Sequence, residues 1–450
     1  MAKKKACAAK ISVLPKEKQP FKIPNNWFWT DIASINGYSG TAVDPMKFPE
    51  TIYELYSVPS SANDFPEIIS GSEIGSSKQS VIKNDVLLCK INPKINRVWK
   101  VSQHTENELL ASSEWIVIRN QILNSDYMMF CFRTQFFREY MLSNVSGVGG
   151  SLMRAQPKFV KNYPIPIAPV AEQQRIVDRI ESIFAKLDEA KEKAQAVVDG
   201  FELRKSAILH KAFTGELTAK WREEHSLTLD DWETDNLGDR FEIMSGVQKT
   251  PARTPKDHPI PYLAVANVYR DSVDVSEIRY FEVADDELER LKLKNKDLLI
   301  VEGNGSGNEI GRCAMWRGEL PVCIHQNHII RMRKKDEKIL EEYVLYYLNS
   351  DAGKKIMKIR AKTTAGLYNL SVGKIRTIPV PFAMLEEQIE IVRILDSLLA
   401  KKNAAKEAAE SVLEQIDTMK KAVLARAFRG ELGTNDPAEE SAVELLKSML

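Results

Sequence analysis

The stretch from 172 to 217, EQQRIVDRIESIFAKLDEAKEKAQAVVDGFELRKSAILHKAFTGEL, occurs a second time from 387 to 432 as EQIEIVRILDSLLAKKNAAKEAAESVLEQIDTMKKAVLARAFRGEL. The two copies align without a gap, and each position aligns with the one 215 residues later, as Glu172 aligns with Glu387. About 23 of the 54 positions aligned from Pro164 to Leu217 are identical. A gapless match of this length indicates an internal repeat.

Each copy predicts one long helix with an apolar stripe. In the first copy, apolar residues follow one another in steps of four and three, which is typical of a coiled-coil seam: Ile176, Ile180, Ile183, Leu187, Ala190, Ala194, Val197 and Phe201. The second copy predicts the same seam, interrupted only at Lys402: Ile391, Leu395, Leu398, Ala405, Ala409, Val412, Ile416, Met419 and Val423. Two unrelated amphipathic core helices would explain the periodicity but not the shared register.

The glycine near the end of each copy, Gly215 and Gly430, is placed to end the helix in a left-handed cap. Some 40 residues at about 1.5 Å each make a rod of roughly 60 Å. Charged residues flank the seam, as a solvated coiled-coil surface requires. The sequence therefore predicts two similar rods.

The segments before each rod resemble one another in organisation but not in detail. The first has β-like runs at 86–89 and 115–118 and an amphipathic helix near 125–142, with Ser125 and Asp126 as its cap. The second has matching runs at 296–301 and 329–333 and a helix at 340–348. We expect an α+β chain in which two α/β domains are separated by two helices that pair as an antiparallel coiled coil, with a pseudo-two-fold repeat.

The predicted boundaries follow from this order: 1–20 a disordered basic tail, 21–170 the first globular domain, 171–217 the first rod, 226–385 the second domain, 386–432 the second rod, and 433–450 a tail. The sequence leaves open whether the last segment packs against the N-terminal part or floats.

Composition limits the classes of function. Lys and Arg number 63 against 62 Asp and Glu, a net charge of +1, so any basic surface must be local. The five cysteines are scattered and lack the spacing of a zinc site, and we expect a reducing cytoplasm and no metal. The pair His325 and His328 lacks an evident third ligand. There is no signal peptide and no apolar run of membrane-spanning length.

In a duplicated chain that keeps its spacer sequence while its globular halves diverge, the two spacers perform the same task. The two globular halves perform related but distinct tasks. If the rods pack antiparallel, a two-fold axis relates the domains, and they face a ligand in opposite senses. Duplex DNA has strands of opposite sense, and two-fold proteins match it with half-sites about 34–36 Å apart or a multiple of that.

These features together resemble the DNA specificity subunits of type I restriction-modification systems. The resemblance covers about residues 23–432 and rests on the domains that open with Trp27 and Trp232, the Pro-x-Pro junctions, the Glu-Gln pairs that open each rod, the final Ala-Phe-x-Gly-Glu-Leu and the run 297–312. It implies two target-recognition domains, each reading half of a split double-stranded DNA site, and helices that dock two methyltransferase subunits. Restriction and translocase subunits would join through these.

The resemblance also implies that the chain is not a catalyst and binds no cofactor, with S-adenosylmethionine on the methyltransferase and ATP and Mg on the restriction subunit. The residues agree. The nearest string to the amino-methyltransferase signature Asn-Pro-Pro-aromatic is 92–95, which lacks the second proline and the aromatic residue. The glycine-rich run 302–308 has no Gly-Lys-Ser/Thr ending for a nucleotide phosphate.

Base edges are read by Arg, Lys, Asn, Gln, Ser and Thr side chains on loops, and phosphates by the same donors. In the first domain the candidates are Lys90, Asn92, Lys94, Asn96, Arg97, Ser146, Ser151 and Arg154. In the second domain they are Asn304, Ser306, Asn308, Arg312, His325, Gln326, Asn327, Lys362, Thr363 and Thr364. A solvated loop residue is the alternative at each position.

Partner docking is expected on the spacer helices, with Ile176, Ile180, Ile183, Leu187, Val197, Phe201, Ile391, Leu395, Leu398, Val412 and Ile416 as candidates. Further apolar positions, Leu209 and Leu424 among them, could instead pack against the chain's own domains. Two other classes stay open. One is a coiled-coil adaptor that binds proteins and no DNA, and the other is the recognition half of an enzyme.

Overall fold

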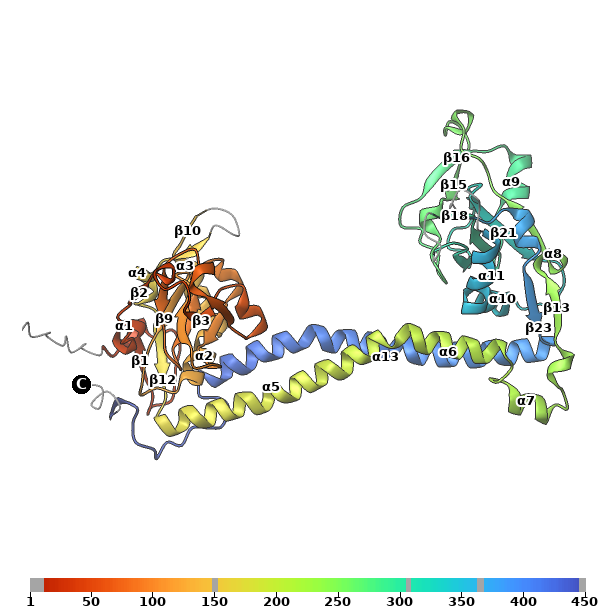
Figure 1. Cartoon of the computed structure of the whole chain (residues 1–450). Helices are drawn as coiled ribbons and strands as arrows, with labels where there is room; N and C mark the ends of the chain where they lie inside the picture. Colours follow the sequence, from red (N-terminus) through yellow and green to blue (C-terminus); the bar gives the residue numbers. More distant parts are fainter. Residues whose placement is uncertain (1–11, 148–152, 305–308, 362–367, 445–450) are drawn as a thin grey trace, which may run out of the picture. The chain divides into compact units, whose positions relative to one another are not determined.

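The computed structural model describes residues 12–147, 153–304, 309–361 and 368–444. The chain forms two compact units (Figure 1): unit 1 comprises 1–194 and 411–450, and unit 2 comprises 195–410. Both boundaries fall inside the long helices. Each unit therefore holds one globular domain, the start of the helix that follows this domain, and the end of the other helix.

Domain 1, the globular part of unit 1, contains a five-stranded sheet of order β2-β5-β8-β3-β4, a three-stranded sheet β7-β6-β9, and the pairs β1-β12 and β10-β11. Its elements are β1 (Phe28–Asp31), α1 (Ile32–Ile35), β2 (Ala42–Val43), β3 (Ile52–Tyr56), β4 (Glu67–Ser70), β5 (Lys78–Ser80), β6 (Val86–Cys89), β7 (Val98–Lys100), β8 (Glu108–Ala111), β9 (Trp115–Ile118), α2 (Ser125–Phe132), α3 (Gln135–Ser143), β10 (Val145–Ser146), β11 (Arg154–Ala155), α4 (Pro157–Val160) and β12 (Pro164–Ile167).

Domain 2, the globular part of unit 2, contains the sheets β14-β21-β17-β19 and β16-β15-β20 and the pairs β13-β23 and β18-β22. Its elements are β13 (Glu233–Asn236), α8 (Leu237–Arg240), β14 (Phe241–Ser245), β15 (Pro259–Leu263), β16 (Arg279–Glu282), α9 (Asp285–Leu291), β17 (Leu298–Val301), β18 (Gly303–Asn304), β19 (Cys313–Met315), β20 (Ile324–His325), β21 (Ile329–Lys334), α10 (Glu341–Asn349), α11 (Asp351–Ala361), β22 (Tyr368–Asn369), α12 (Val372–Arg376) and β23 (Pro379–Phe382).

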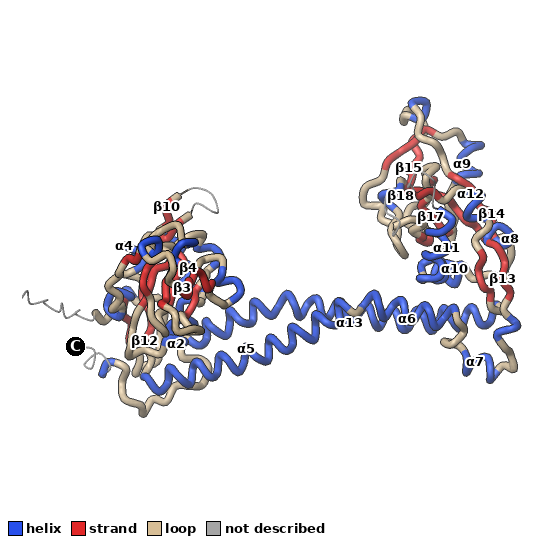
Figure 2. Tube along the Cα trace, viewed as in Figure 1, coloured by secondary structure: helices blue, strands red, loops and turns tan. Residues whose placement is uncertain are grey.

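The long helices are α5 (Val170–Asp199), α6 (Phe201–Phe213) and α13 (Leu385–Ala427), and the short α7 (Ala219–Glu224) follows α6 (Figure 2). The first predicted rod is thus two helices, separated at Gly200, where the second rod has Gln415 and is unbroken. Glycine is among the poorest helix formers, which explains the single interruption. Gly215 and Gly430 have φ of 77° and 75°, which confirms the two predicted left-handed caps.

The predicted seam of α5 is correct, and that of α13 is half correct. Ile391, Leu395, Ala409 and Ile416 are buried, but Val412 and Met419 are exposed and Leu398 is only partly buried. Ala405 of the predicted seam is also exposed, and part of the packed face is one residue further on: Leu399 is buried, and Lys406, Leu413 and Lys420 are partly buried. Lysine is polar in the sequence pattern, yet its aliphatic stem packs: the ammonium of Lys420 lies over Phe184 in unit 1 and that of Lys406 over Phe201 in unit 2. Lys402, which is also partly buried, is therefore no interruption.

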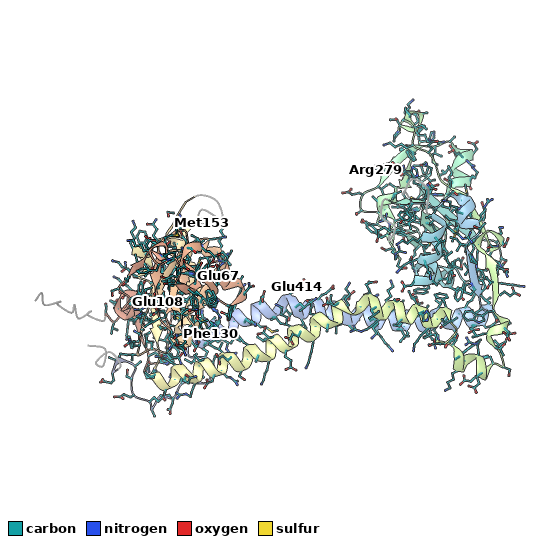
Figure 3. All side chains as sticks on the ribbon, in the orientation of Figure 1. Glu67, Glu108, Phe130, Met153, Arg279 and Glu414 are labelled. Carbon is teal, nitrogen blue, oxygen red and sulfur yellow. The ribbon has the colours of Figure 1, made fainter. Side chains whose placement is uncertain are left out.

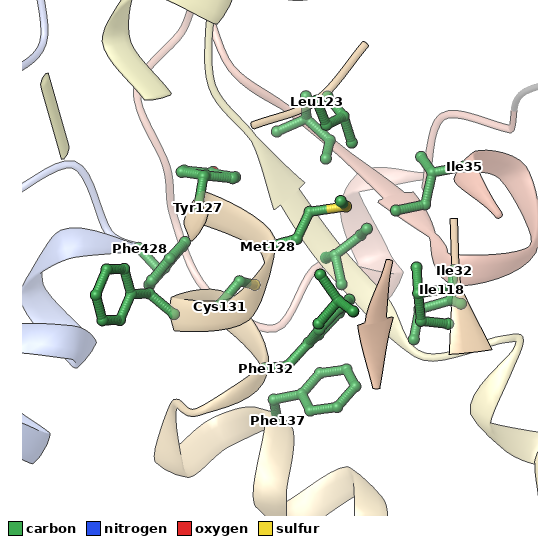
Figure 4. Close-up of a cluster of buried hydrophobic side chains, with 14 of the residues drawn as sticks. Ile32, Ile35, Ile118, Leu123, Tyr127, Met128, Cys131, Phe132, Phe137 and Phe428 are labelled. Atoms are coloured by element: carbon green, nitrogen blue, oxygen red, sulfur yellow. The ribbon is translucent and has the colours of Figure 1, made fainter. Parts of the chain in front are cut away.

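Within each unit the helices pack antiparallel and close the core of the globular domain. In unit 1, Ile176 and Ile180 of α5 share a core with Leu424 and Phe428 from the end of the second helical repeat. Figure 4 shows Phe428 beside Tyr127 of α2, with ring centroids 5.0 Å apart. In unit 2, Leu209 and Ala212 of α6 share a core with Ile391 and Leu395. Leu209 and Leu424 are accordingly core residues of the chain itself.

Three other expectations about local structure are wrong. The helix near 125–142 is broken into α2 and α3 at Thr134, whose side chain caps α3, and α2 is capped by Asn124 rather than by Ser125 or Asp126. Residues 12–20 are not a free tail, because the Leu14 amide donates to Trp29 and the Thr30 hydroxyl donates to Ser12. Residues 1–11 lie outside the described part of the chain.

The C-terminal segment, which the sequence left open, packs on domain 1. Asn26 donates to Asp436 and accepts from the Ala442 amide, the Arg175 guanidinium binds both carboxylate oxygens of Glu439, and Ala442 is buried. Residues 433–444 are therefore part of the fold of unit 1.

One set of contacts joins each domain to its helices, and it occurs twice. In unit 1 the buried Glu172 at the start of α5 accepts a hydrogen bond from the Trp27 indole at 2.7 Å and from Asn435 at 2.8 Å. In unit 2 the buried Glu387 accepts from Trp232 at 2.8 Å, from Thr218 at 2.7 Å and from Arg222 at 2.5 Å. We call the contacts of these two carboxylates the junctions.

The next residue and a tyrosine extend each junction. Gln173 accepts from the Asn124 amide at the start of α2, and Gln388 accepts from the Leu340 amide at the start of α10. Tyr127 donates to Pro166 at 2.8 Å, and its counterpart Tyr343 donates to Pro381 at 2.6 Å. Burial raises the pKa of both tyrosines, so both hydroxyls keep their protons and donate.

Candidate nucleic-acid interface

In domain 1 the structure brings the sequence-predicted residues together on two neighbouring loops. The loop after β6 lies against the loop that leads into β11: the Asn92 amide donates to Met153 at 2.8 Å, and the Ala155 amide donates to Lys90 at 2.8 Å. Met153 lies at the end of the domain that points away from the helices (Figure 3). The described part of this cluster comprises Lys90, Asn92, Lys94, Asn96, Arg97, Ser146 and Arg154.

Within this cluster some residues are free to contact a ligand and others support the backbone. Lys94 and Ser146 are exposed, and Arg154 is exposed with one ion pair to Glu114 at 3.1 Å. Asn92 and Asn96 have φ of 44° and 52°, a backbone conformation that asparagine tolerates better than most residues. The Asn96 side chain also donates to Arg133 at 3.2 Å, so a structural role accounts for this residue.

In domain 2 the equivalent loops also lie together. The backbones of Gly303 and Asn304 pair with Asn369 and Tyr368, and the Leu370 amide donates to Glu302 at 2.7 Å. The candidates Ser151, Ser306, Asn308, Lys362, Thr363 and Thr364 lie outside the described residues, and they remain predictions.

His325 is not available to a ligand in this structure, contrary to the expectation. Its side chain is fully buried, and its Nδ1 donates to the Ile329 carbonyl at 2.8 Å. Burial lowers the pKa of His325 to about 4, so the ring is neutral near pH 7. His328 is exposed and pairs with Glu302 at 3.1 Å, so the two histidines have different surroundings. The apolar strand Ile324–His325 places the ring in the core.

Gln326 and Arg312 lie at a second polar surface of domain 2. Gln326 lines a pocket with Tyr269, Asn267 and Arg279. Arg312 is half-buried, donates to Val265 at 3.2 Å and lies over the Tyr269 ring at 6.0 Å, so it supports this surface. Asn327 is partly buried, and its amide donates to Val247.

Sequence reasoning missed Tyr269 and Arg279, which are exposed on this surface. Arg279 is labelled in Figure 3, at the end of domain 2 that points away from α6 and α13. Tyr269 lies between β15 and β16 and Arg279 begins β16; their signal was an aromatic and a basic residue near one strand, which a search for repeated sequence positions passes over.

The comparison with protein families agrees with the repeat. The family described as "Type I restriction modification DNA specificity domain" matches the chain twice, over residues 43–198 and 229–415. The chain belongs to this family. It is a DNA specificity subunit of a type I restriction-modification system, and its two family segments are the two halves of the internal repeat.

Relatives of this specificity subunit are similar over most of their length. The EcoKI specificity subunit of Escherichia coli (strain K12) is 28% identical over 372 residues, which cover 80% of this chain and 77% of the relative. The StySPI specificity subunit of Salmonella potsdam is 25% identical over 320 residues, covering 71% and 68%.

Solved structures show the same fold. A crystal structure of the HsdS subunit from Thermoanaerobacter tengcongensis matches with a TM-score of 0.68 at 19% identity, covering 92% of this chain and 99% of that one. A chain from a study of complex assembly and conformational transition of the type I R-M system matches with a TM-score of 0.67 at 20% identity, covering 92% and 100%.

The spacer helices of the specificity subunit divide into a buried and an exposed set. Ile176, Ile180, Ile391, Leu395 and Ile416 are buried, and Ile183, Leu187, Val197, Phe201 and Leu398 are partly buried, so they hold the helices to one another and to the domains. Val412 is 41% exposed and, with Met419, faces solvent in unit 1. Leu203 is 76% exposed and, with Ile389, faces solvent in unit 2. The exposed set is the better candidate for docking.

No helix in the described ranges combines the length and the apolar character needed to cross a membrane. The four cysteines within these ranges, Cys89, Cys131, Cys313 and Cys323, are buried free thiols.

Proposed function

We propose that this specificity subunit reads a bipartite, gapped DNA site, with one half-site bound by each globular domain. The observation that carries the proposal is the pair of loop clusters at equivalent places of a repeated domain. In domain 1 the cluster offers Lys94, Ser146 and Arg154, and in domain 2 the equivalent loops offer different residues. Equivalent places with different side chains are what two unlike half-sites require.

The near-neutral charge of the chain fits a role inside a larger complex. Phosphate neutralisation supplies much of the free energy of DNA binding, and a net charge of +1 provides little of it. We propose that two methyltransferase subunits dock on the helices, where Val412, Met419, Leu203 and Ile389 leave apolar side chains exposed. Restriction and translocase subunits would join through these.

The chain itself is proposed to be non-catalytic, to hold no metal or cofactor and to work in the cytoplasm. The missing methyltransferase signature at 92–95 and the missing Gly-Lys-Ser/Thr ending after 302–308 support the non-catalytic role. S-adenosylmethionine, ATP and Mg would bind to the partner subunits.

The decisive experiment co-expresses the chain with its cognate methyltransferase subunit and maps modified bases across the host genome. A motif of two short defined blocks around a gap of fixed length, with one modified base on each strand, is the expected result. A stable complex that leaves no such motif would favour a protein-binding adaptor instead and would contradict DNA reading.

Single substitutions then test the interface. Lys94→Ala or Arg154→Ala in the assembled complex should weaken DNA binding and reduce the slope of log affinity against log salt by about 0.9 for each phosphate that is no longer neutralised. Lys191→Ala, which removes an exposed lysine from α5, is the matched control and should leave the slope unchanged. Equal effects of all three variants would contradict this assignment.

A further inference from the structure

The two junctions are alike in construction although the domains they hold have diverged. Each buries one carboxylate at the start of a long helix, and Glu172 and Glu387 have side chains no more than about 1% exposed. Each carboxylate accepts an indole N–H from the first tryptophan of its domain. Each also accepts hydrogen bonds from the segment that follows the end of the other helix, at Thr434 and Asn435 in unit 1 and at Thr218 and Arg222 in unit 2.

Such a carboxylate fixes the orientation of the domain on its helices and does not only stabilise the fold. A buried charge is unfavourable unless its hydrogen bonds are satisfied, and these bonds are directional. Here the donors come from two segments: the tryptophan directly before the first strand of the domain, and the segment that follows the end of the other helix. All of them must keep their places for the carboxylate to remain satisfied, so the domain is held at one orientation on its helices.

The helix ends are fitted to the same arrangement. A Cβ on Gly430 would lie 2.3 Å from Pro24, and a Cβ on Gly215 would lie 2.3 Å from Leu229. Pro24 and Leu229 each stand three residues before the junction tryptophan and accept a hydrogen bond from its backbone amide. The cap, the tryptophan and the carboxylate thus form one close-packed unit in each half.

We propose that Glu172 and Glu387 are positioning residues that set the length of the gap between the two half-sites. The inference rests on the proposed reading of a bipartite site. One added base pair moves a half-site by about 3.4 Å along the duplex and turns it by roughly a tenth of a helical turn. A domain held at one orientation cannot follow that movement. A domain with a loosened junction can, without any change in the loops that face the DNA.

The test replaces Glu387 by glutamine. An amide of the same shape accepts at only one of its two ends, so its NH₂ group must face one of the donors from Trp232, Thr218 or Arg222. Glu172→Gln makes the same change in unit 1. The matched controls are Glu390→Gln and Glu189→Gln, which neutralise carboxylates of intrahelical ion pairs on α13 and α5 and leave the junctions intact.

Each variant is assembled with the methyltransferase subunit, and methylation is mapped at sites that carry both half-sites with the wild-type gap and with gaps one base pair shorter or longer. We expect methylation at the altered gaps, relative to the wild-type gap, to rise at least about tenfold, the factor for the loss of one charge-assisted hydrogen bond. The bases read in each half-site should not change, and the controls should keep the wild-type ratio.

A purely structural role gives a different result. If the junction only stabilises the fold, methylation falls at all gaps in proportion and the ratio stays at the wild-type value, which overturns the proposal. Thr218→Val removes one donor and keeps the carboxylate, so it covers the case in which Glu387→Gln does not fold; it should raise the same ratio, and an unchanged ratio overturns the proposal. If the wild-type complex yields no gapped motif, the proposed function itself fails.

Discussion

Replacing Arg222 by methionine tests the energetics of the junction in unit 2. The guanidinium donates to Glu387 at 2.5 Å, to Thr218 at 3.0 Å and to the Gly215 carbonyl, and its carbon lies 5.8 Å from the centre of the Trp232 ring. The side chains of Arg222 and Glu387 are 7% and 1% exposed, so solvent screens the pair very little. Methionine retains most of the apolar stem but leaves the carboxylate without its cation.

The magnitude follows from this burial. Removing one partner of a buried ion pair typically destabilises a fold by about 3–5 kcal/mol, because the remaining charge is uncompensated. Thr218 and Trp232 would still donate to Glu387, so we expect the lower end, about 3 kcal/mol. When hydrogen exchange follows opening of unit 2, that value makes the backbone amides in 385–395 and 210–222 exchange on the order of 100-fold faster than in the wild type.

Hydrogen exchange read by mass spectrometry resolves the two units separately, so unit 1 serves as an internal reference. Peptides from 172–180 should exchange as in the wild type. Arg393→Met breaks an exposed pair with Glu390 on the same helix, and because solvent screens this pair we expect exchange within about twofold of the wild type there. The reasoning is refuted if Arg222→Met exchanges within twofold of the wild type, or if Arg393→Met has an equal effect.

Three further predictions concern other parts of the chain. Tyr127→Phe and Tyr343→Phe each remove one buried hydrogen bond to a proline carbonyl. Each should destabilise its own unit by about 1 kcal/mol, measured by hydrogen exchange. Destabilisation of the other unit would contradict the assignment. Asn435→Ala removes hydrogen bonds to Glu172 and Asn26, and it should lower the free energy of unfolding of unit 1 by about 2 kcal/mol without affecting unit 2. If the C-terminal segment were free, the substitution would leave unit 1 unchanged. Below about pH 6.5 His325 is protonated in the unfolded chain, whereas it stays neutral in the folded chain down to about pH 4. The free energy of unfolding that is present above pH 6.5 therefore decreases as the pH falls from 6.5 to 4. The loss should reach about 3 kcal/mol in unit 2, and His325→Asn, which keeps a donor for Ile329, should show a shallower pH dependence in denaturant titrations followed by exchange.

The parts of the fold that the sequence predicts correctly are those with a local signal. The strands β6 and β9 have the bounds that the sequence predicts, because each is a short apolar run between turn residues. The caps at Gly215 and Gly430 follow from glycine at the end of a periodic helix. The loops of domain 1 are predictable as a cluster because polar residues follow a buried strand, and the repeat indicates the equivalent loops of domain 2.

The parts that the sequence predicts wrongly depend on contacts between distant segments. The predicted seam of α13 is displaced by one residue over part of its length, because nothing local shows that Lys406 and Lys420 lie over the aromatic rings of Phe201 and Phe184. The sequence pattern places His325 on the surface, whereas its burial depends on Ile329 and on strands distant in sequence. Glu172 reads as one more charge on a solvated helix, and only its recurrence 215 residues later suggests otherwise.

The distribution of identity and divergence in the chain supports a division of labour between junction and loops. Tryptophan, glutamate, glutamine, tyrosine and glycine recur at the two junctions and make the same contacts, although the domains above them share few residues. A purely stabilising contact could be replaced by apolar packing of similar volume, often at no cost in stability. Buried hydrogen-bonded charges specify geometry in a way that apolar packing does not, so their repetition fits a demand on orientation that both halves share. The loops of the two domains do not share a requirement of this kind, so their residues differ.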